Sequence, residues 1–340
     1  MHFLRDLPLA GFNSFGVCAT ARQFANVSSE IALMNWCAAH GRDTPPFLLG
    51  GGSNLLLTRD IEAPVLQIAP RGARIVWDEG STVLVEAMAG EPWHPFVQWT
   101  LAQGLSGLEN LSLIPGYVGA APVQNIGAYG VEIADSCDGV MTIDTDTGEP
   151  RDFRKSECGF GYRDSVFKHG NDGVRDRYAI MRVRFHLSRR FTPHLDYGDI
   201  KVELQQASVK EPTAMDVSRA VIAIRSHKLP DPAVIGNAGS FFKNPVVAAD
   251  IALSLKSRFP DMPQYPAANE QVKVAAGWLI EQAGWKGRRM GRAGVHDRHA
   301  LVLVNHGGAT GAEIWALAQA VQSDVQDKFG IALEPEPRVI

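Results

Sequence analysis

Apolar residues recur at helical spacing in two parts of the chain. One predicted helix follows Ser29, a suitable N-cap, and ends before Gly41. Its apolar stripe consists of Ile31, Met34, Cys37 and Ala38. A second predicted helix, residues 310–330, opens with the capping box Thr310-x-x-Glu313 and ends at Gly330. Its stripe consists of Ile314, Leu317, Ala318, Val321, Val325 and Phe329.

The rest of the pattern predicts a mixture of strands and helices. A short strand at residues 46–50, "PFLLG", follows the first helix and leads through a glycine-rich loop to another apolar run. Between residues 65 and 186, β-rich pieces such as "STVLVEAMAG" and "YAIMRVRFHL" surround a loop-rich middle. Helices dominate again after Thr213. This order favours an α+β fold.

Composition narrows the class of protein. The chain has 340 residues, 45% of them hydrophobic and 21% charged, which suits two or three globular domains. A net charge of −4 without a long basic run argues against nucleic-acid or membrane binding. The N-terminus lacks the apolar core of a signal peptide, and no apolar run approaches the ~18 residues that span a bilayer. We therefore expect a cytoplasmic protein.

The cysteines give no sign of a metal site. Cys18, Cys37, Cys137 and Cys158 lie far apart and form no C-x-x-C pair. We therefore expect neither a bound metal nor a disulfide framework.

Residues 48–57, "LLGGGSNLLL", place three glycines between apolar runs. Successive N–H groups at Gly50, Gly51 and Gly52 can form a concave anion site, to which Ser53 and Asn54 add a hydroxyl and an amide. A tight turn between strands is the alternative interpretation. The loop is not a P-loop, because Gly-Lys-Ser/Thr is absent, and it does not follow the Rossmann pattern.

A second glycine cluster lies at residues 112–135 and carries almost no charge. Such a backbone suits a flat, neutral heterocycle better than solvent. The two clusters together predict one extended ligand, a dinucleotide with a pyrophosphate and an aromatic ring system. The candidate contacts in the second cluster are Pro115, Gly116, Gly119, Ala120, Gln124, Asn125, Gly127 and Tyr129.

Six ordered motifs resemble the UDP-N-acetylenolpyruvoylglucosamine reductase family, the flavoenzymes of bacterial peptidoglycan precursor synthesis. They are "LLGGGSNLL", "IPGYVGAAPVQNIGAYG", "YRDSVFK", "GNAGSFFKNPVV", "AAGWLIEQAG" and "LEPEPRVI". The segment "LDYGDI", residues 195–200, resembles the subtype that carries a tyrosine-bearing loop over the substrate.

The resemblance implies an FAD-binding fold of the vanillyl-alcohol-oxidase type in two subdomains, followed by an α+β substrate domain. It implies subdomain 1 at residues 1–69 with 330–340, subdomain 2 at 70–228 and the substrate domain at 229–329. It also implies non-covalent FAD, NADPH as reductant and a sugar-nucleotide substrate. The residues give no signal for the oligomeric state, and we expect a monomer. In the implied reaction a hydride passes from flavin N5 to the terminal carbon of the enolpyruvyl group.

The same resemblance assigns catalytic roles to Arg163, Ser240 and Glu336. A planar guanidinium can meet both oxygens of an enolate–carboxylate system, so Arg163 suits the charge that develops there. Ser240 is the implied proton donor to the α-carbon, with Lys243 a candidate to stabilise the resulting alkoxide. Glu336 makes sense as a neutral donor facing a carboxylate. Glu334 is its rival two residues earlier.

On the substrate side, Tyr197, Lys228 and Asn244 match positions that contact the diphosphate, and their side chains suit it. Taken singly, each candidate also has a structural interpretation: a surface ion pair for Arg163, a cap for Ser240, and a solvated charge for Glu336 and Lys228.

Two departures from the family stand out. Ala120-Ala121 replaces a frequent Ser-Ser pair, and His299 stands where a glutamine is frequent.

Three other classes of function remain open from the residues alone. A flavin oxidase of the same fold superfamily would give the C-terminal motifs no purpose. A non-catalytic nucleotide-binding module would need only the two glycine clusters. A serine hydrolase is suggested by Gly239-Ser240 and ten histidines, but a G-x-S-x-G elbow is missing.

Overall fold

Residues 1–169 and 176–340 are described by a computed structural model, in which the chain divides into two units made of interleaved segments. Unit 1 comprises Met1–Leu7, Thr20–Gly52 and Ile61–His227. Unit 2 comprises Pro8–Ala19, Ser53–Asp60 and Lys228–Ile340.

A four-stranded sheet gathers the N-terminal strands in the order β1 (Leu4–Pro8), β2 (Thr20–Val27), β5 (Val65–Ile68), β3 (Phe47–Leu49). Strands β2 and β3 both pair with β5 in parallel, and Phe24 and Phe47 both have Val65 as their Cα partner. The carboxyl ends of these three strands therefore lie at one edge. Loops at such an edge are where open parallel sheets bind ligands, and the glycine-rich loop follows β3 there.

Helix α1 (Glu30–His40) confirms the first predicted helix, with Ala32 N–H donating to Oγ of Ser29 at 3.3 Å. The predicted apolar stripe is confirmed at Cys37, which is buried, but it is wrong at Ile31, which is 71% exposed, and it omits Leu33, which is buried. Gly41 is not a left-handed cap either. Its backbone is right-handed helical, and a Cβ there would lie 1.7 Å from the carbonyl oxygen of Thr145. Close packing, not turn geometry, requires the glycine.

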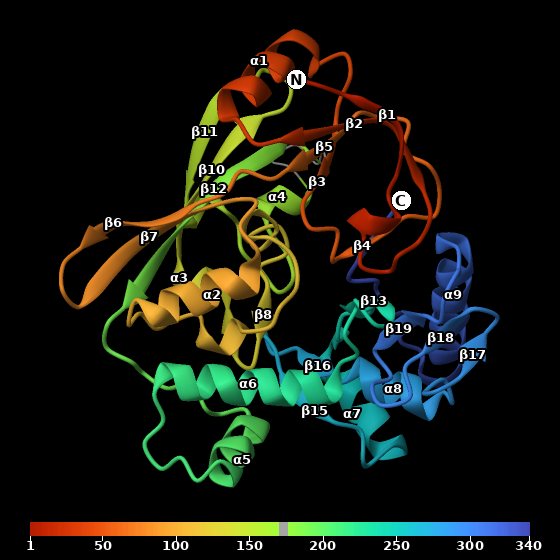
Figure 1. The fold of residues 1–340 in the computed structure, drawn as a ribbon. Helices are drawn as coiled ribbons and strands as arrows, with labels where there is room; N and C mark the ends of the chain where they lie inside the picture. The colour runs from red at the N-terminus through yellow and green to blue at the C-terminus, as the bar shows by residue number, and fades with distance from the viewer. Residues whose placement is uncertain (170–175) are drawn as a thin grey trace. The chain divides into compact units, whose positions relative to one another are not determined.

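A five-stranded antiparallel sheet forms the centre of unit 1 (Figure 1). Its order is β11 (Pro150–Arg154), β10 (Cys137–Asp144), β12 (Tyr178–Ser188), β7 (Thr82–Met88), β6 (Ala73–Asp78). Strands β7 and β12 confirm the two β-rich segments read from the sequence. Helix α2 (Trp93–Ala102) packs on this sheet, where the Phe96 and Phe185 rings lie 5.2 Å apart. This contact belongs to the main core of unit 1.

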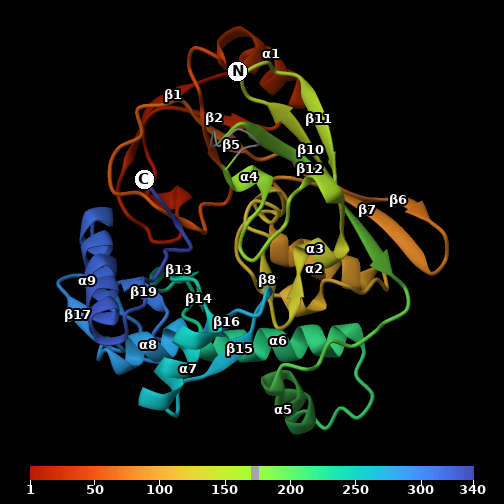
Figure 2. The ribbon, with the colours of Figure 1, turned by 180° about the vertical axis from the view of Figure 1, so that it is seen from behind.

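Shorter elements complete unit 1. They are β8 (Gly127–Ala128), β9 (Val131–Glu132), α3 (Ile133–Ser136), α4 (Val166–His169) and the 3₁₀ turns Glu109–Leu111, Val118–Ala120 and Lys155–Glu157. Helix α5 (Gly198–Gln206) lies against α6 (Ala214–Lys228), as Figure 2 shows. The two helices share a small apolar cluster that includes Ile200, Leu204, Val217 and Val221.

Unit 2 contains short strands and three helices. One sheet has the order β13 (Gly236–Ser240), β19 (Val302–Asn305), β18 (Ala293–Val295), β17 (Arg289–Met290). Another has the order β14 (Val246–Val247), β16 (Val272–Val274), β15 (Gln264–Pro266). The helices are α7 (Ala249–Arg258), α8 (Ala276–Gln282) and α9 (Gly311–Phe329), with a 3₁₀ turn at Ala10–Phe12. The predicted dominance of helices after Thr213 overlooked these strands, which are too short to show periodicity.

Helix α9 confirms the second predicted helix in detail. The capping box between Thr310 and Glu313 is formed, and Gly330 adopts a left-handed φ of 71°. All six residues of the predicted stripe are buried. The C-terminal strand β20 (Arg338–Val339) pairs in parallel with β4 (Leu55–Leu56) of the same unit.

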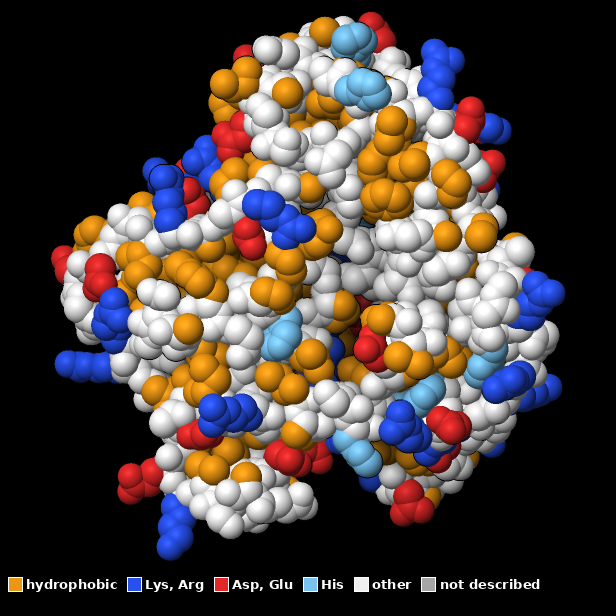
Figure 3. Space-filling model, in the orientation of Figure 1, with side chains coloured by type: hydrophobic (Ala, Val, Ile, Leu, Met, Phe, Trp, Pro, Cys, Tyr) orange, Lys and Arg blue, Asp and Glu red, His pale blue; other side chains and the backbone are white. Residues whose placement is uncertain are grey.

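Among the described residues, no helix combines the length and apolar character needed to cross a membrane. On the face drawn in Figure 3, basic and acidic side chains are interspersed and do not gather into a patch of one sign.

Candidate functional site

The two glycine-rich clusters lie against each other in unit 1. A Cβ built on Gly51 would lie 3.0 Å from the Cα of Gly116 and 3.3 Å from the ring of Tyr117. A Cβ on the neighbouring Gly50 would meet only the Ala120 side chain, at an ordinary 3.5 Å. The structure therefore brings together two loops that the sequence separates by more than sixty residues, and glycine permits the close approach.

The second loop is firmly anchored at its start. Trp93 N–H donates to the Gly116 carbonyl at 2.9 Å, and Gly119 N–H donates to the Ala89 carbonyl at 2.9 Å. A Cβ on Gly119 would lie only 2.5 Å from the Ala89 side chain. These bonds fix the wall that faces Gly51.

The middle of the loop is held by the side chain of Asn125, which is 1% exposed. Its amide donates to Glu132 at 2.6 Å and to the Gly161 carbonyl at 3.0 Å, and its oxygen accepts from Ala134 N–H at 3.0 Å. Because these bonds engage both ends of the side-chain amide, the predicted contact of Asn125 with a cofactor would use its main chain. The same side chain ties this loop to the segment that carries Arg163.

The other predicted cofactor residues are distributed along both loops. Gly52 has a φ of 63°, and Ala120 ends the 3₁₀ turn Val118–Ala120. Pro115 is exposed and Gln124 is half-buried in unit 1. Ser53 and Asn54 belong to unit 2, where the Asn54 amide donates to the Glu336 carbonyl at 3.3 Å.

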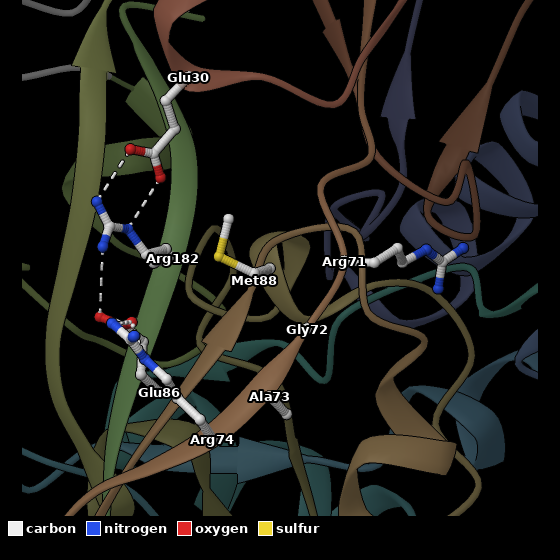
Figure 4. A pocket seen from close by; sticks show the side chains of 8 residues that line it. All are labelled: Glu30, Arg71, Gly72, Ala73, Arg74, Glu86, Met88 and Arg182. Carbon is white, nitrogen blue, oxygen red and sulfur yellow. Dashed lines mark hydrogen bonds and ion pairs between the residues drawn. The ribbon is translucent and has the colours of Figure 1, made fainter.

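A pocket of about 370 Å³ opens in unit 1 near the carboxyl ends of β2 and β5 (Figure 4). Most of its charged groups are paired: Arg182 with Glu30 at 2.9 Å, and Arg74 with Glu86 at 2.8 Å. Arg71 instead points away from these pairs, and its guanidinium lies 5.1 Å from the centre of the Tyr117 ring. No motif of the sequence predicted this pocket.

Arg163 lies on a tight turn and has a φ of 56°. Its Nη2 donates to the Gly127 carbonyl at 2.7 Å, so the guanidinium is oriented by the second glycine loop. A Cβ on Gly127 would lie 3.0 Å from Nη1 of Arg163, which explains the need for glycine there. Tyr129, two residues further on, has its ring 5.8 Å from that of Tyr197, and burial raises the pKa of the Tyr129 hydroxyl.

Arg225 on α6 is a member of this group that sequence reasoning missed. Its Nε donates to the Leu113 carbonyl at 3.3 Å. No Asp or Glu of the described chain forms an ion pair with it, and burial together with the nearby Arg163 cation lowers the pKa of its guanidinium. Two neighbouring guanidinium groups in a partly buried place favour an anionic ligand. A single arginine in a helix gave no such signal in the sequence.

Ser240 and Glu336 lie on neighbouring segments of unit 2. Ser240 ends β13, and its Cα partner is Val302. Glu336 N–H donates to the carbonyl of Phe241, the residue after Ser240, at 2.8 Å. Glu334 is exposed and forms an ion pair with Lys243. Of the two carboxylates, Glu336 is therefore the better candidate to act together with Ser240. Glu334 is the carboxylate partner of Lys243.

The predicted diphosphate residues fall in both units. Tyr197, which is 54% exposed, precedes α5 in unit 1. Lys228 and Asn244 belong to unit 2, and Lys228 is exposed. The Asn244 oxygen accepts from Ala276 N–H at 2.9 Å, so the NH₂ group of this amide is the part that suits a phosphate.

The paired glycine loops fit the pyrophosphate-bearing dinucleotide that the sequence predicts. Gly51 faces the Gly116 backbone so closely that any side chain would fill the space between the loops. Such a cradle of glycine main chain suits a pyrophosphate.

Comparison with known proteins gives matches along nearly the whole chain. A sequence model of the UDP-N-acetylenolpyruvoylglucosamine reductase C-terminal domain matches residues 231–340, and one of the FAD binding domain matches residues 22–154. UDP-N-acetylenolpyruvoylglucosamine reductase of Pseudomonas fluorescens is 56% identical over 337 residues, which cover 98% of both chains. That of Chromobacterium violaceum is 54% identical over 343 residues, covering 100% of this chain and 99% of its own.

A solved structure shows the same likeness. The crystal structure of UDP-N-acetylenolpyruvylglucosamine reductase from Thermus caldophilus has a TM-score of 0.68 and 25% sequence identity, covering 100% of this chain and 99% of its own.

These findings define the chain as an FAD-dependent oxidoreductase with an α+β fold, the FAD-binding part being of the vanillyl-alcohol-oxidase type. FAD is its cofactor, and NADPH is its reductant. More particularly, the chain belongs to the UDP-N-acetylenolpyruvoylglucosamine reductase family, as the sequence motifs predicted. The division into subdomains at residue 69, with residues 330–340 returning to the first, stays a prediction.

Proposed function

We propose that this chain reduces the enolpyruvyl group of UDP-N-acetylenolpyruvoylglucosamine to give UDP-N-acetylmuramate, with NADPH as the source of electrons. Family membership over nearly the whole length is the observation that carries the proposal. The reductant is a cytoplasmic molecule, so we place the enzyme in the cytoplasm, and we expect it to act as a monomer.

The glycine loops hold the cofactor in this proposal. Main-chain N–H groups of Gly50, Gly51 and Gly52 bind the pyrophosphate, and the loop from Pro115 to Tyr129 lies along the ring system. Bound FAD supplies the hydride that the reaction needs.

Arg163 acts on the charge that develops in the substrate. When the enolpyruvyl group accepts a hydride, negative charge spreads over the α-carbon and the neighbouring carboxylate. A guanidinium already oriented by the Gly127 carbonyl needs no reorganisation to meet that charge, which is the condition for stabilising a transition state. Arg225 adds a second positive charge close to Arg163.

Ser240 and Glu336 complete the reaction. Ser240 delivers a proton to the α-carbon, and Glu336 serves as a neutral donor to the substrate. The bond between Glu336 N–H and the Phe241 carbonyl keeps these two segments in register. Tyr197, Lys228 and Asn244 bind the diphosphate.

The proposal is tested by following the flavin colour in two steps under anaerobic conditions. NADPH should bleach the yellow holoenzyme, and the enolpyruvyl sugar nucleotide should then restore the colour with formation of the lactyl product. A holoenzyme that is bleached but not recoloured by this substrate would contradict the proposed function. The related sugar nucleotide UDP-N-acetylglucosamine, which lacks the enolpyruvyl group and its double bond, is the control.

A further inference from the structure

Leu113 is a strained residue at the start of the second glycine loop. Its φ of 58° lies in the left-handed region, which is costly for a leucine and persists only where the surroundings hold it. A hydrogen bond on each side of the residue does so. Leu113 N–H donates to Nδ1 of His94 at 3.0 Å, and the Leu113 carbonyl accepts from Nε of Arg225 at 3.3 Å. One leucine therefore connects a histidine of α2 with an arginine of α6.

The segment around Leu113 is fastened to both of these helices. The indole N–H of Trp93 on α2 donates to the Leu111 carbonyl at 2.9 Å. The hydroxyls of Ser112 and Ser218 form a hydrogen bond at 2.8 Å, and Ser218 belongs to α6. The two helices lie next to each other in both views of the ribbon (Figures 1 and 2). The position of the Leu113 carbonyl is thus set by α2 and α6 together.

The imidazole of His94 is suited to accept the Leu113 N–H. Burial first, and then the positive charge of Arg225, lower the pKa of His94, so the ring is neutral at pH 7. A neutral imidazole that accepts at Nδ1 carries its proton on Nε2. Nδ1 therefore remains an acceptor while the nearby guanidinium remains charged.

We propose that His94 is a positioning residue for Arg225. By holding the N–H of Leu113 in its strained conformation, His94 fixes the carbonyl that orients the guanidinium. The bond to this carbonyl uses Nε of Arg225, so it does not engage the two terminal nitrogens, which can meet both oxygens of a carboxylate. The inference rests on the proposed function, because the enolpyruvyl carboxylate is the anion that Arg225 and Arg163 would share.

Titration calorimetry of the oxidised holoenzyme with two sugar nucleotides tests this inference. One is the enolpyruvyl sugar nucleotide, and the other is UDP-N-acetylglucosamine, which has no carboxylate. His94→Leu removes the acceptor but keeps a side chain of similar size. It should bind the enolpyruvyl sugar nucleotide about tenfold or more weakly, because the strained peptide loses its partner and the guanidinium its orientation. Its affinity for UDP-N-acetylglucosamine should change by less than about twofold.

His94→Asn is the rescue variant, because Oδ1 of an asparagine can take the place of Nδ1 and accept the same N–H. It should bind the enolpyruvyl sugar nucleotide within about twofold of the unaltered protein. His94→Gln is a second loss variant, because its amide lies one bond further from the main chain. It should show the same selective loss as His94→Leu, and it replaces that variant if His94→Leu does not retain FAD.

Gln98→Leu is the matched control. Gln98 lies about one turn further along α2 and also bonds to α6, where its amide donates to Oγ of Ser218 at 2.9 Å. The substitution removes a bond between the same two helices that does not involve the Leu113 peptide. This variant should keep the ratio of the two affinities within about twofold of the unaltered protein.

Equal weakening of both nucleotides in the loss variants would overturn the inference and show that His94 only supports the fold. An unchanged affinity for the enolpyruvyl sugar nucleotide would overturn it as well, and so would a His94→Asn variant that binds no better than His94→Leu. None of these results touches the proposed function, which depends on the bleaching and recolouring of the flavin in the unaltered protein.

Discussion

Gly51 offers a sharp test of the close approach between the two glycine loops. Replacement by alanine would place a methyl group 3.0 Å from the Gly116 Cα and 3.3 Å from the Tyr117 ring. Both distances are shorter than ordinary carbon–carbon contacts of about 3.5–4.0 Å, so one loop must shift. Gly51 does not lie in the left-handed region, so the expected strain is purely steric.

The wall opposite Gly51 has little freedom to yield. The Gly116 carbonyl accepts from Trp93 N–H, and Val118 N–H donates to the Glu91 carbonyl at 2.8 Å. Overpacking at such sites typically costs about 1–3 kcal/mol. In the free protein the two loops can move apart and relieve the strain, but FAD binding must bring them together again. The cost of about 1–3 kcal/mol then makes FAD binding about 5- to 150-fold weaker.

The assay compares FAD affinity with the stability of the FAD-free protein. Fluorescence titration gives the dissociation constant for FAD, and urea unfolding of the apoprotein shows whether the strain is already present without the cofactor. Gly51→Val should have a larger effect than Gly51→Ala because it carries two more methyl groups. For Gly51→Ala, the loss of FAD binding free energy and the loss of unfolding free energy should add up to about 1–3 kcal/mol.

Gly50→Ala is the matched control, because its methyl group would meet only the Ala120 side chain at 3.5 Å. Gly50 also lies outside the left-handed region, and the substitution keeps its N–H group. This variant should keep FAD affinity and stability within about a factor of two of the unaltered protein. Equal behaviour of the Gly50 and Gly51 variants would refute the reasoning.

Three other predictions concern separate parts of the molecule. Ser240→Ala should leave flavin reduction by NADPH nearly intact but slow reoxidation by the enolpyruvyl substrate about 10²-fold, with partial recovery in Ser240→Cys; stopped-flow absorbance measures both steps, and equal loss in both would exclude a proton donor. Tyr197→Phe should raise the apparent KM for the sugar nucleotide without changing flavin reduction; damage to both half-reactions would instead show a structural role. Thr310→Ala removes the cap of α9 and should lower the free energy of unfolding by about 1 kcal/mol in urea, whereas an unchanged value would show that the capping box contributes nothing.

The sequence by itself determined the elements whose causes are local. Helix α9 follows from a capping box, one apolar stripe and a terminal glycine, all within about twenty residues, and the structure reproduces each of them. The strands at residues 82–88 and 178–188 likewise follow from β-branched and aromatic residues. Six ordered motifs also sufficed to predict the family. Interactions between residues that are close in sequence produce a pattern that is visible within a short segment of the chain.

Only the tertiary structure decided which surfaces meet. The sequence placed Ile31 on the buried face of α1 with Cys37, but the neighbouring elements bury Leu33 with Cys37 and leave Ile31 exposed. Gly41 looked like a helix cap, whereas the carbonyl oxygen of Thr145 is what excludes a side chain there. The contact of Gly51 with Gly116 and the two guanidinium groups of Arg163 and Arg225 depend in the same way on residues distant in sequence. Side-chain contacts and electrostatic forces act through space, so a pattern along one segment cannot reveal them.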